Sequence, residues 1–325
     1  MQVPRIWRFV VGVVVAVLVG QSSIALGGVA AYWRFEEGPN GGSVLKGGVP
    51  DGTFYPGVAD SSGNGNALSA WSEASWAGYV YRTDVPAGTV PQTGAANNFS
   101  VQNGGGYPGM FTGSDAMRTM TPAAFTIEAS FKPETGGYRT IIGRDSQGAT
   151  SNDTNLAALY YQIIPGDAVA IKFADVSGVW HEAVSAAGAV KGFAYPDTSA
   201  GHWYHMAAVS DGSLLSLYLN DVDVGTGYQL VAQTDMTASG SPNTALTAGL
   251  GSGGDWTAGT WSVGRGLYAG GHGDRAYGLI DEVRISDSAL SVNQFLFSVV
   301  PEPASLASLS LLVLGLLARR RGRPR

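Results

Sequence analysis

Apolar and polar residues alternate with a period of two in several short stretches of this 325-residue chain. The clearest stretch, FTIEASFKP at 125–133, places its apolar side chains on one face and its polar ones on the other. Such alternation is typical of half-buried β-strands. Similar strands are predicted at 30–38, 138–144, 156–164, 168–176, 203–210, 214–224, 260–266 and from 278 onward.

Turn signals separate these stretches. Pro165-Gly166-Asp167 and Asp211-Gly212 predict hairpins, and a further turn is predicted at Asn220-Asp221. No stretch between the two ends of the chain has the period of a helix. Short strands joined by tight turns indicate an all-β fold with two antiparallel sheets packed as a sandwich.

Asp281 interrupts the pattern of GLIDEVRISDSALS at 278–291. A strict period of two places it on the same face as Leu279, Val283 and Ile285, which predicts that it points toward the core. A carboxylate there is costly unless it is paired, hydrogen-bonded or bound to a cation. Asp281 is therefore predicted to be either a metal ligand or a residue at the sheet rim that caps a loop.

The loop DSSGNGNAL at 60–68 offers further oxygen ligands, Asp60 and Asn64. Its glycines permit positive φ angles, so it is equally typical of a polar turn.

The two ends of the chain are unlike the rest. Residues 1–25 combine two arginines, a short apolar run and small residues, as a secretory signal peptide does. Residues 300–325 contain Pro301, Glu302 and Pro303, then an apolar segment at 306–317 predicted to form a short hydrophobic helix, then arginines. One domain is predicted between them, at 29–299, with an irregular insertion at about 69–120.

Charge and cysteine content narrow the function classes. The two ends hold seven of the 19 basic residues but only one of the 25 acidic ones, which leaves 12 basic and 24 acidic residues and a net charge near −12 between them. So acidic a surface argues against a nucleic-acid partner. The chain has no cysteine, so its core must stabilise it without disulfides, with help from a metal if one binds.

Taken together, several segments resemble the LamG-like jelly-roll family of the concanavalin A-like lectin and glucanase group. They follow the family's order and are AYWRFEEG, DSSGNGN, FTIEASFKPE, YRTIIGRD, WYHMAAVSDGSLLSLYLNDV, WSVGRG and GLIDEVRISDSALS. The resemblance implies that the first and last strands are neighbours and that a structural calcium binds at Asp281 and opening-strand backbone oxygens. Asn220-Asp221 departs from the family's Asn-Gly turn.

The C-terminal end resembles the PEP-CTERM sorting signal of Gram-negative bacteria that make extracellular polysaccharide. The resemblance implies transient anchoring in the inner membrane, cleavage by a transpeptidase-like sorting enzyme near Pro301-Glu302-Pro303, and release to the cell surface or extracellular matrix. An apolar run of this length is marginal for a membrane span, and the arginines after it suit a positive-inside stop.

Tryptophans outside the predicted strands are candidate sugar-stacking residues, namely Trp71, Trp76 and Trp256. They could equally fold inward as a cover over the domain. The sequence lacks the Glu-x-Asp-x-x-Glu pattern of related glucanases, and no helix follows the glycine-rich run at 249–254. The chain is therefore predicted to be non-enzymatic and to bind glycans or matrix components. The alternatives are a purely structural or adhesion protein of the matrix and, less favoured, a glycan-cleaving enzyme.

Overall fold

The computed structural model describes residues 28–44, 56–72, 78–145, 157–249, 258–268 and 271–299. Two antiparallel β-sheets make up nearly all of the regular structure in these ranges, which confirms the predicted all-β sandwich. The predicted signal peptide and sorting tail, including Pro301, Glu302 and Pro303, lie outside the described residues, as do Trp76 and Trp256. No helix within the described ranges has the length and apolar character needed to cross a membrane.

The first sheet has the strand order β14-β13-β12-β7-β18-β5-β4, and β1 also pairs with β18. This pairing brings the first and last strands together, as the resemblance implied. The strands are β1 (Val29–Trp33), β4 (Tyr79–Arg82), β5 (Ser100–Asn103), β7 (Phe125–Pro133), β12 (Tyr204–Ser210), β13 (Leu214–Asp221), β14 (Gln229–Asp235) and β18 (Gly278–Ser286).

The second sheet has the order β11-β10-β9-β8-β15-β6-β3-β2. Its strands are β2 (Pro56–Val58), β3 (Leu68–Trp71), β6 (Gly109–Phe111), β8 (Arg139–Asp145), β9 (Leu159–Ile164), β10 (Ala168–Ala174), β11 (Trp180–Val184) and β15 (Thr260–Val263). A small hairpin joins β16 (Gly266–Tyr268) to β17 (Gly271–Gly273). Helix α1 (Asp115–Thr119) and 3-10 turns at Thr198–Ala200, Met236–Ser239 and Val292–Gln294 complete the described elements.

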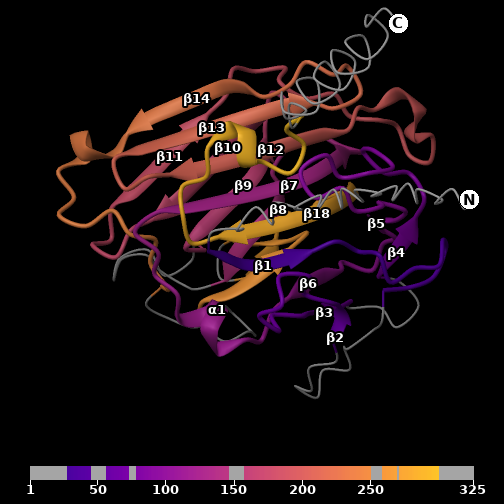
Figure 1. Cartoon of the computed structure of the whole chain (residues 1–325), viewed down its shortest axis with the longest axis horizontal. Helices are drawn as coiled ribbons and strands as arrows, with labels where there is room; N and C mark the ends of the chain where they lie inside the picture. The colour runs from indigo at the N-terminus through magenta and orange to yellow at the C-terminus, as the bar shows by residue number, and fades with distance from the viewer. Residues whose placement is uncertain are drawn as a thin grey trace, which may run out of the picture.

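The two sheets lie one behind the other in Figure 1. The buried apolar side chains of the core fill the space between them. Apolar residues of β7 face those of the second sheet, and the rings of Phe125 and Phe173 meet edge to face with centroids 5.2 Å apart. Alternation along β7 leaves Glu128 and Ser130 on the opposite, outer face of the first sheet. Burial of these apolar side chains is the main stabilising contribution to the sandwich.

Turn chemistry predicted two of the hairpins correctly. Gly166 and Gly212 adopt φ angles of 87° and 90° between β9 and β10 and between β12 and β13. The turn predicted at Asn220-Asp221 is wrong, because both residues still belong to β13 and pair with β12. The chain reverses after them, where Gly225 and Gly227 supply the positive φ angles.

The predicted irregular insertion at 69–120 contains more order than its sequence indicated. It supplies most of β3, all of β4, β5 and β6, and helix α1. Strands β4 and β5 extend the first sheet, whereas β3 and β6 extend the second. These strands have three or four residues each, too few for alternation to reveal them.

A β-bulge in β18 corrects the predicted orientation of Asp281. Asp281 pairs with Ser130 and Arg284 pairs with Glu128, so β18 has one more residue than β7 between these pairs. Glu282 occupies the bulge with a φ angle of 48°. The extra residue inverts the alternation, so Ile280, Val283 and Ile285 all reach the core. Asp281 therefore lies on the outer face, the opposite of the prediction.

Two segments cover the outer face of the first sheet. The strap, which we define as residues 287–299, crosses in front of β12 and β13 (Figure 1), where Phe297 packs on His205 at 4.7 Å between centroids. The second segment, residues 84–99, bonds to the strap through Gln92 N–H and Leu296 O at 3.1 Å. Side chains on this face are thereby removed from solvent.

Candidate functional site

The outer face of the second sheet contains a groove of about 470 Å³. Strands β9, β10 and β11 form its floor, and the residues before β8 and the β16–β17 hairpin contribute to its walls. Its lining combines aromatic, aliphatic and polar side chains, namely Tyr138, Tyr160, Gln162, Ile164, Ala170, Lys172, Glu182, Val184, Tyr268 and Asp274. Its size is that of a small-ligand site.

Strand register explains why the groove is hollow. Lys172 lies opposite both Tyr160 and Glu182, and in the next row Ala170 lies opposite both Gln162 and Val184. Residues two apart on a strand share a face, so these two rows form one continuous surface. The methyl group of Ala170 leaves the centre of the second row low between larger neighbours.

Three tyrosines give the groove its aromatic character. Tyr138 and Tyr268 are 52% and 60% exposed, so their ring faces are available to a ligand. Tyr160 is buried, and its hydroxyl is fixed between Leu267 O at 2.5 Å and Ala157 N–H at 2.8 Å. An aromatic ring held this way loses little conformational entropy when a ligand binds.

Polar groups of both charges lie among the rings. Lys172 Nζ lies 4.9 Å from the centroid of the Trp180 ring, which holds the amine beside the groove. Gln162 accepts a hydrogen bond from Thr140 Oγ1 at 3.3 Å and keeps its amide N–H groups as donors. Burial raises the pKa of Asp274, although the nearby Arg139 guanidinium acts to lower it.

The carboxylates of the groove are poorly placed for glycoside hydrolysis. Glu182 is on β11, and Asp274 is bonded to the far edge of β8 through Thr140 N–H. Four strand spacings of about 4.8 Å separate the backbones of these two residues across the sheet, about 19 Å in all. Glycosidases need their two carboxyl groups within roughly 5–9.5 Å. The groove therefore has the features of a binding site rather than those of such an active site.

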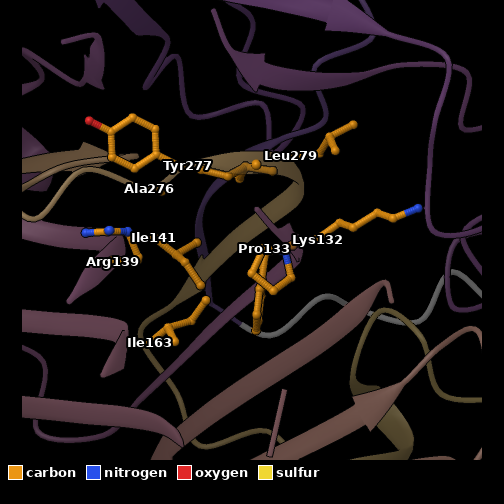
Figure 2. A pocket seen from close by; sticks show the side chains of 11 residues that line it. Lys132, Pro133, Arg139, Ile141, Ile163, Ala276, Tyr277 and Leu279 are labelled. Carbon is orange, nitrogen blue, oxygen red and sulfur yellow. The ribbon is translucent and has the colours of Figure 1, made fainter. Parts of the chain in front are cut away.

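A second hollow between the sheets is too small to be a site. It measures about 10 Å³ and is lined by apolar side chains such as Ile141 and Ile163, which point toward each other in Figure 2. That volume holds at most one water molecule.

The predicted sugar-stacking residue Trp71 does not lie in the groove. It ends β3, three strands away from β8 in the second sheet. Trp71 is half-buried, and the Arg265 guanidinium carbon lies 5.5 Å from its ring centroid. Its placement fits the alternative interpretation of a covering ring, and the predicted sites at Trp76 and Trp256 lie outside the described residues.

Asp281 is fully buried beneath residues 84–99. Its Oδ2 accepts a hydrogen bond from Asn97 Nδ2, and its Oδ1 accepts one from Glu282 N–H, each at 2.8 Å. Burial and the adjacent Glu282 carboxylate raise its pKa well above the ordinary value. Asn97 Oδ1 is also buried and has no hydrogen-bond partner. A flip of the Asn97 side-chain amide would place Asn97 Oδ1 beside Asp281, as a second oxygen ligand for a cation.

Asp60 and Asn64 form hydrogen bonds within their own loop and to β1. Asp60 accepts hydrogen bonds from Tyr32 N–H, Ser62 N–H, Ser62 Oγ and Asn66 N–H. Asn64 donates its amide to Val29 O at 2.7 Å. Both residues thus attach the loop to β1 directly, in agreement with the polar-turn alternative. Within the described residues no group of three or more His, Cys, Asp or Glu side chains is arranged to hold a metal.

A chain of catalytic-type residues lies on the outer face of the first sheet, out of reach of any substrate. Ser130 Oγ lies 2.7 Å from His205 Nδ1, and His205 Nε2 lies 3.3 Å from Glu128 Oε1. All three side chains are fully buried, and Arg284 holds the other Glu128 oxygen. Glu128 is therefore part of a buried structural network. His202 pairs separately with Asp221 at 2.8 Å.

Sequence reasoning missed the groove tyrosines because it considered only tryptophans outside the predicted strands as sugar-stacking residues. A usable signal exists in β9, where the alternation of LYYQII places Tyr160 and Gln162 on one face and Tyr161 and Ile163 on the other. Tyr138 and Tyr268 stand at strand ends beside glycine-rich turns. Aromatic residues in such places remain at the surface, where a ligand can reach them.

Comparison with solved structures finds similar proteins at low sequence identity. The binding domain of Paraclostridial Mosquitocidal Protein 1 has a TM-score of 0.45 and 12% identity, with 83% of this chain and 52% of that chain covered. This chain thus spans about half of that domain's length. Domain 4 of AbnA, an extracellular arabinanase from Geobacillus stearothermophilus, in complex with arabinotriose, has a TM-score of 0.45 and 17% identity, covering 82% and 96%. The Ruminococcus gnavus IT-sialidase CBM40 bound to alpha2,3 sialyllactose has a TM-score of 0.38 and 14% identity, with 55% of this chain and 83% of that chain covered.

Comparison with curated proteins finds no match. A family model described as the concanavalin A-like lectin/glucanases superfamily matches residues 103–294. The match spans more than half of the 325 residues, from β5 through the groove strands to the strap. The two packed sheets and the pairing of first and last strands agree with it. The chain therefore belongs to the concanavalin A-like lectin/glucanases superfamily.

Proposed function

We propose that this chain is an exported, non-enzymatic protein that binds glycans in the groove on the outer face of the second sheet. The observation that carries the proposal is the combination, in one groove of about 470 Å³, of tyrosine rings with amide, amine and carboxylate groups. The equivalent face of the first sheet is closed by the strap and by residues 84–99. The groove is thus the better candidate for contact with a polymer.

The chemistry of the lining suits a sugar chain. One face of a sugar ring carries C–H groups and stacks on an aromatic ring, as Tyr138 and Tyr268 are placed to allow. Sugar hydroxyls can both donate and accept hydrogen bonds, which matches Gln162, Lys172 and Glu182. A few directional polar groups among apolar ones are the usual source of orientation and specificity in binding sites.

Calcium binding at Asp281 forms a further part of the proposal. The carboxylate and the Asn97 carbonyl oxygen are hard ligands of the kind that Ca²⁺ prefers, and backbone oxygens and water would supply the remainder. A bound cation would offset the cost of two adjacent buried carboxyl groups, Asp281 and Glu282. Its role would be to stabilise the β18 bulge rather than to contact the glycan. Asp60 and Asn64 are not needed as ligands in this arrangement.

Export and sorting complete the proposal. We infer from the sequence that residues 1–25 direct secretion and that 300–325 anchor the chain briefly in the inner membrane until a transpeptidase-like enzyme cuts near Pro301-Glu302-Pro303. The destination would be the cell surface or extracellular matrix of a Gram-negative bacterium. Deletion of residues 319–325 should impair retention or processing, and unchanged sorting would count against this inference.

The test is binding of the purified full-length protein to a panel of neutral and acidic polysaccharides, with calcium and after chelation. Saturable binding to one glycan class supports the proposal. A well-folded protein that binds none under either condition would favour the alternative, a structural or adhesion protein of the matrix without a small ligand. Release of reducing sugar ends from any polymer would favour the third possibility, a glycan-cleaving enzyme.

A further inference from the structure

The long axis of the groove runs across the strands of the second sheet. Its lining extends from Glu182 on β11 to Asp274 beyond β8, about 19 Å at four strand spacings. Along β9 it extends only from Tyr160 to Ile164, about 13 Å at the rise of a β-strand. A polymer in the groove would therefore lie across the strands, with β11 at one end and β8 at the other.

The end of the groove at β11 is open. Within the described sheet β11 is the last strand on this side, and the side chains of Glu182 and Val184 are exposed. Strand β14 of the first sheet lies beside β11, where Thr234 Oγ1 donates to Glu182 O at 2.6 Å. This contact involves the backbone of β11 and leaves both groove side chains exposed. A polymer can therefore leave the groove past β11.

The end of the groove at β8 is covered by the small hairpin. Gly143 of β8 pairs with Tyr160, so it shares the face of the groove floor. A Cβ atom at Gly143 would lie 3.0 Å from Arg265 O, which directly precedes β16. A Cβ atom at Gly266 would likewise lie 2.6 Å from Thr140 Oγ1. These glycines thus let β16 lie directly on β8, which fills the space that a polymer would need there.

Asp274 separates the closed end of the groove from the space beyond it. Its side chain lines both the groove and a separate hollow of about 340 Å³. Its backbone is held there by β8, because Thr140 N–H donates to Asp274 O at 2.6 Å. Asp274 also has a φ angle of 46°, which is uncommon outside glycine. Such a conformation persists where the surrounding structure enforces it, and it is often found at functional sites.

The closed end also holds most of the groups that can bind a sugar. Among the described residues none donates a hydrogen bond to the Asp274 carboxyl group, and Arg139 acts on it as a nearby charge. Carboxyl oxygens accept hydrogen bonds from hydroxyl groups in either protonation state. The exposed rings of Tyr138, directly before β8, and Tyr268 of β16 belong to the same end. A sugar unit at this end would thus meet two rings and an acceptor.

We propose that the groove binds the end of a glycan chain. The terminal sugar unit lies against Asp274, beside Tyr138 and Tyr268, and the rest of the chain leaves the groove past β11. The inference rests on the proposed glycan binding and specifies chain ends, rather than internal segments, as the ligand. A terminal unit has a single linkage and can stop at a wall, whereas an internal unit needs space on both sides.

The experiment compares long and short chains of the same polymers by isothermal titration of the full-length protein. The probes are linear arabinan, linear galactan, amylose, polygalacturonate and alginate, each intact and as a shorter fraction from partial hydrolysis. At equal mass the two fractions contain the same number of sugar units, but the short one contains more chain ends. We expect affinity per unit mass to rise with the number of ends, about tenfold for a tenfold shorter fraction.

Removal of the wall is the second arm of the experiment. Asp274→Gly keeps the positive φ angle and deletes the side chain, so that a chain can continue from the groove into the hollow. We expect this variant to bind both fractions equally by mass. Asp167→Gly is the matched control, because Asp167 has a φ angle of 55° in the β9–β10 turn and does not line the groove. It should keep the preference for short chains.

The outcomes distinguish this inference from the proposed function. Equal affinity of the wild-type protein for both fractions, by mass, would overturn binding of chain ends while glycan binding remained. Binding of none of the five polymers would overturn both proposals. A preference for short chains that persists in Asp274→Gly would contradict the role given to Asp274. If that variant does not fold, Asp274→Asn replaces it. The amide preserves the wall, so loss of the preference in Asp274→Asn would equally contradict the role of the side chain as a wall.

Discussion

Arg284 and Glu128 form a fully buried ion pair on the outer face of the first sheet, in which Arg284 Nε donates to Glu128 Oε2 over 2.6 Å. Arg284 also donates to Gln294 O, and Glu128 accepts Leu296 N–H at 2.9 Å. The pair therefore holds the strap against the sheet from which it comes. Burial acts to raise the pKa of Glu128, but Arg284 and His205 outweigh it and keep that pKa low.

Removing Glu128 should destabilise the domain severely. Glu128→Ala leaves the Arg284 charge buried without its partner and frees the strap, which predicts a loss of about 3–5 kcal/mol in the free energy of unfolding. Urea denaturation measures this loss. Asp115→Asn, which breaks the exposed Asp115–Arg118 pair of α1, is the matched control and should cost less than about 1 kcal/mol. Similar losses for the two variants would contradict the buried role.

His205 should make the domain less stable in mild acid. Burial lowers its pKa although Glu128 acts to raise it, so the ring stays neutral to a lower pH in the folded state than in the unfolded state. In the unfolded state, His205 takes up a proton below about pH 6.5. As the pH is lowered further, the free energy of unfolding therefore decreases by up to about 1.4 kcal/mol per pH unit, until the lowered pKa of the folded state is reached.

Replacement of the ring by an amide tests this pH dependence. His205→Gln can still accept from Ser130 and donate to Glu128 but does not titrate. Its stability between pH 5 and 6.5, measured by urea denaturation at several pH values, should therefore be flatter than that of the wild type. His202→Gln, at a partly exposed position, is the control. An unchanged slope in His205→Gln would show that other groups dominate the acid response.

Asp281→Asn should reveal whether the buried carboxylate holds a cation. Without calcium, the raised pKa of Asp281 means that folding opposes its ionisation, so stability falls as pH rises above the ordinary carboxyl range. The amide removes this cost, and the variant should be more stable than the wild type in chelator at pH 7, on the order of 1–2 kcal/mol. Calcium should raise the melting temperature of the wild type and leave the variant unaffected. A calcium effect of equal size in both proteins would exclude Asp281 as a ligand.

Long strands with alternating apolar and polar residues were predictable from the sequence, as β7, β9, β10 and β12 demonstrate. The bulge at Glu282 was not predictable, because the sequence GLIDEVRIS contains no local signal for an extra residue. The register of β18 depends instead on its pairing with β7. Even so, the oddity that the alternation detected at Asp281 is real, since its carboxyl group is buried beside a second one. The short strands β3 to β6 escaped because they are defined by their neighbours rather than by their own pattern.

The candidate site was less accessible to sequence reasoning than the fold. Asp60 could be recognised as a turn residue from the sequence. Whether its carboxylate binds a cation or accepts hydrogen bonds from four backbone and hydroxyl donors depends in part on the position of β1, about 30 residues away. The groove arises where Ala170 lies between larger residues on β9 and β11, a relationship that only the register establishes. Trp71 was predicted to stack on sugars, whereas the exposed rings that line the groove are those of Tyr138 and Tyr268.

Filling the groove should abolish glycan binding without affecting the fold. Ala170→Trp places a large ring at the low centre of the groove, on the face of β10 that points away from the core, and should reduce affinity at least tenfold. Tyr268→Ala removes a stacking surface and should weaken binding about 5- to 150-fold, from a loss of about 1–3 kcal/mol. Tyr195→Ala is the matched control because Tyr195 is equally exposed, at 64% against 60%, but does not line the groove. Isothermal titration with the best polysaccharide of the panel measures all three, and circular dichroism confirms that each remains folded. Full affinity in Ala170→Trp would place the binding surface elsewhere on the molecule, because a ligand cannot occupy the same space as the new ring.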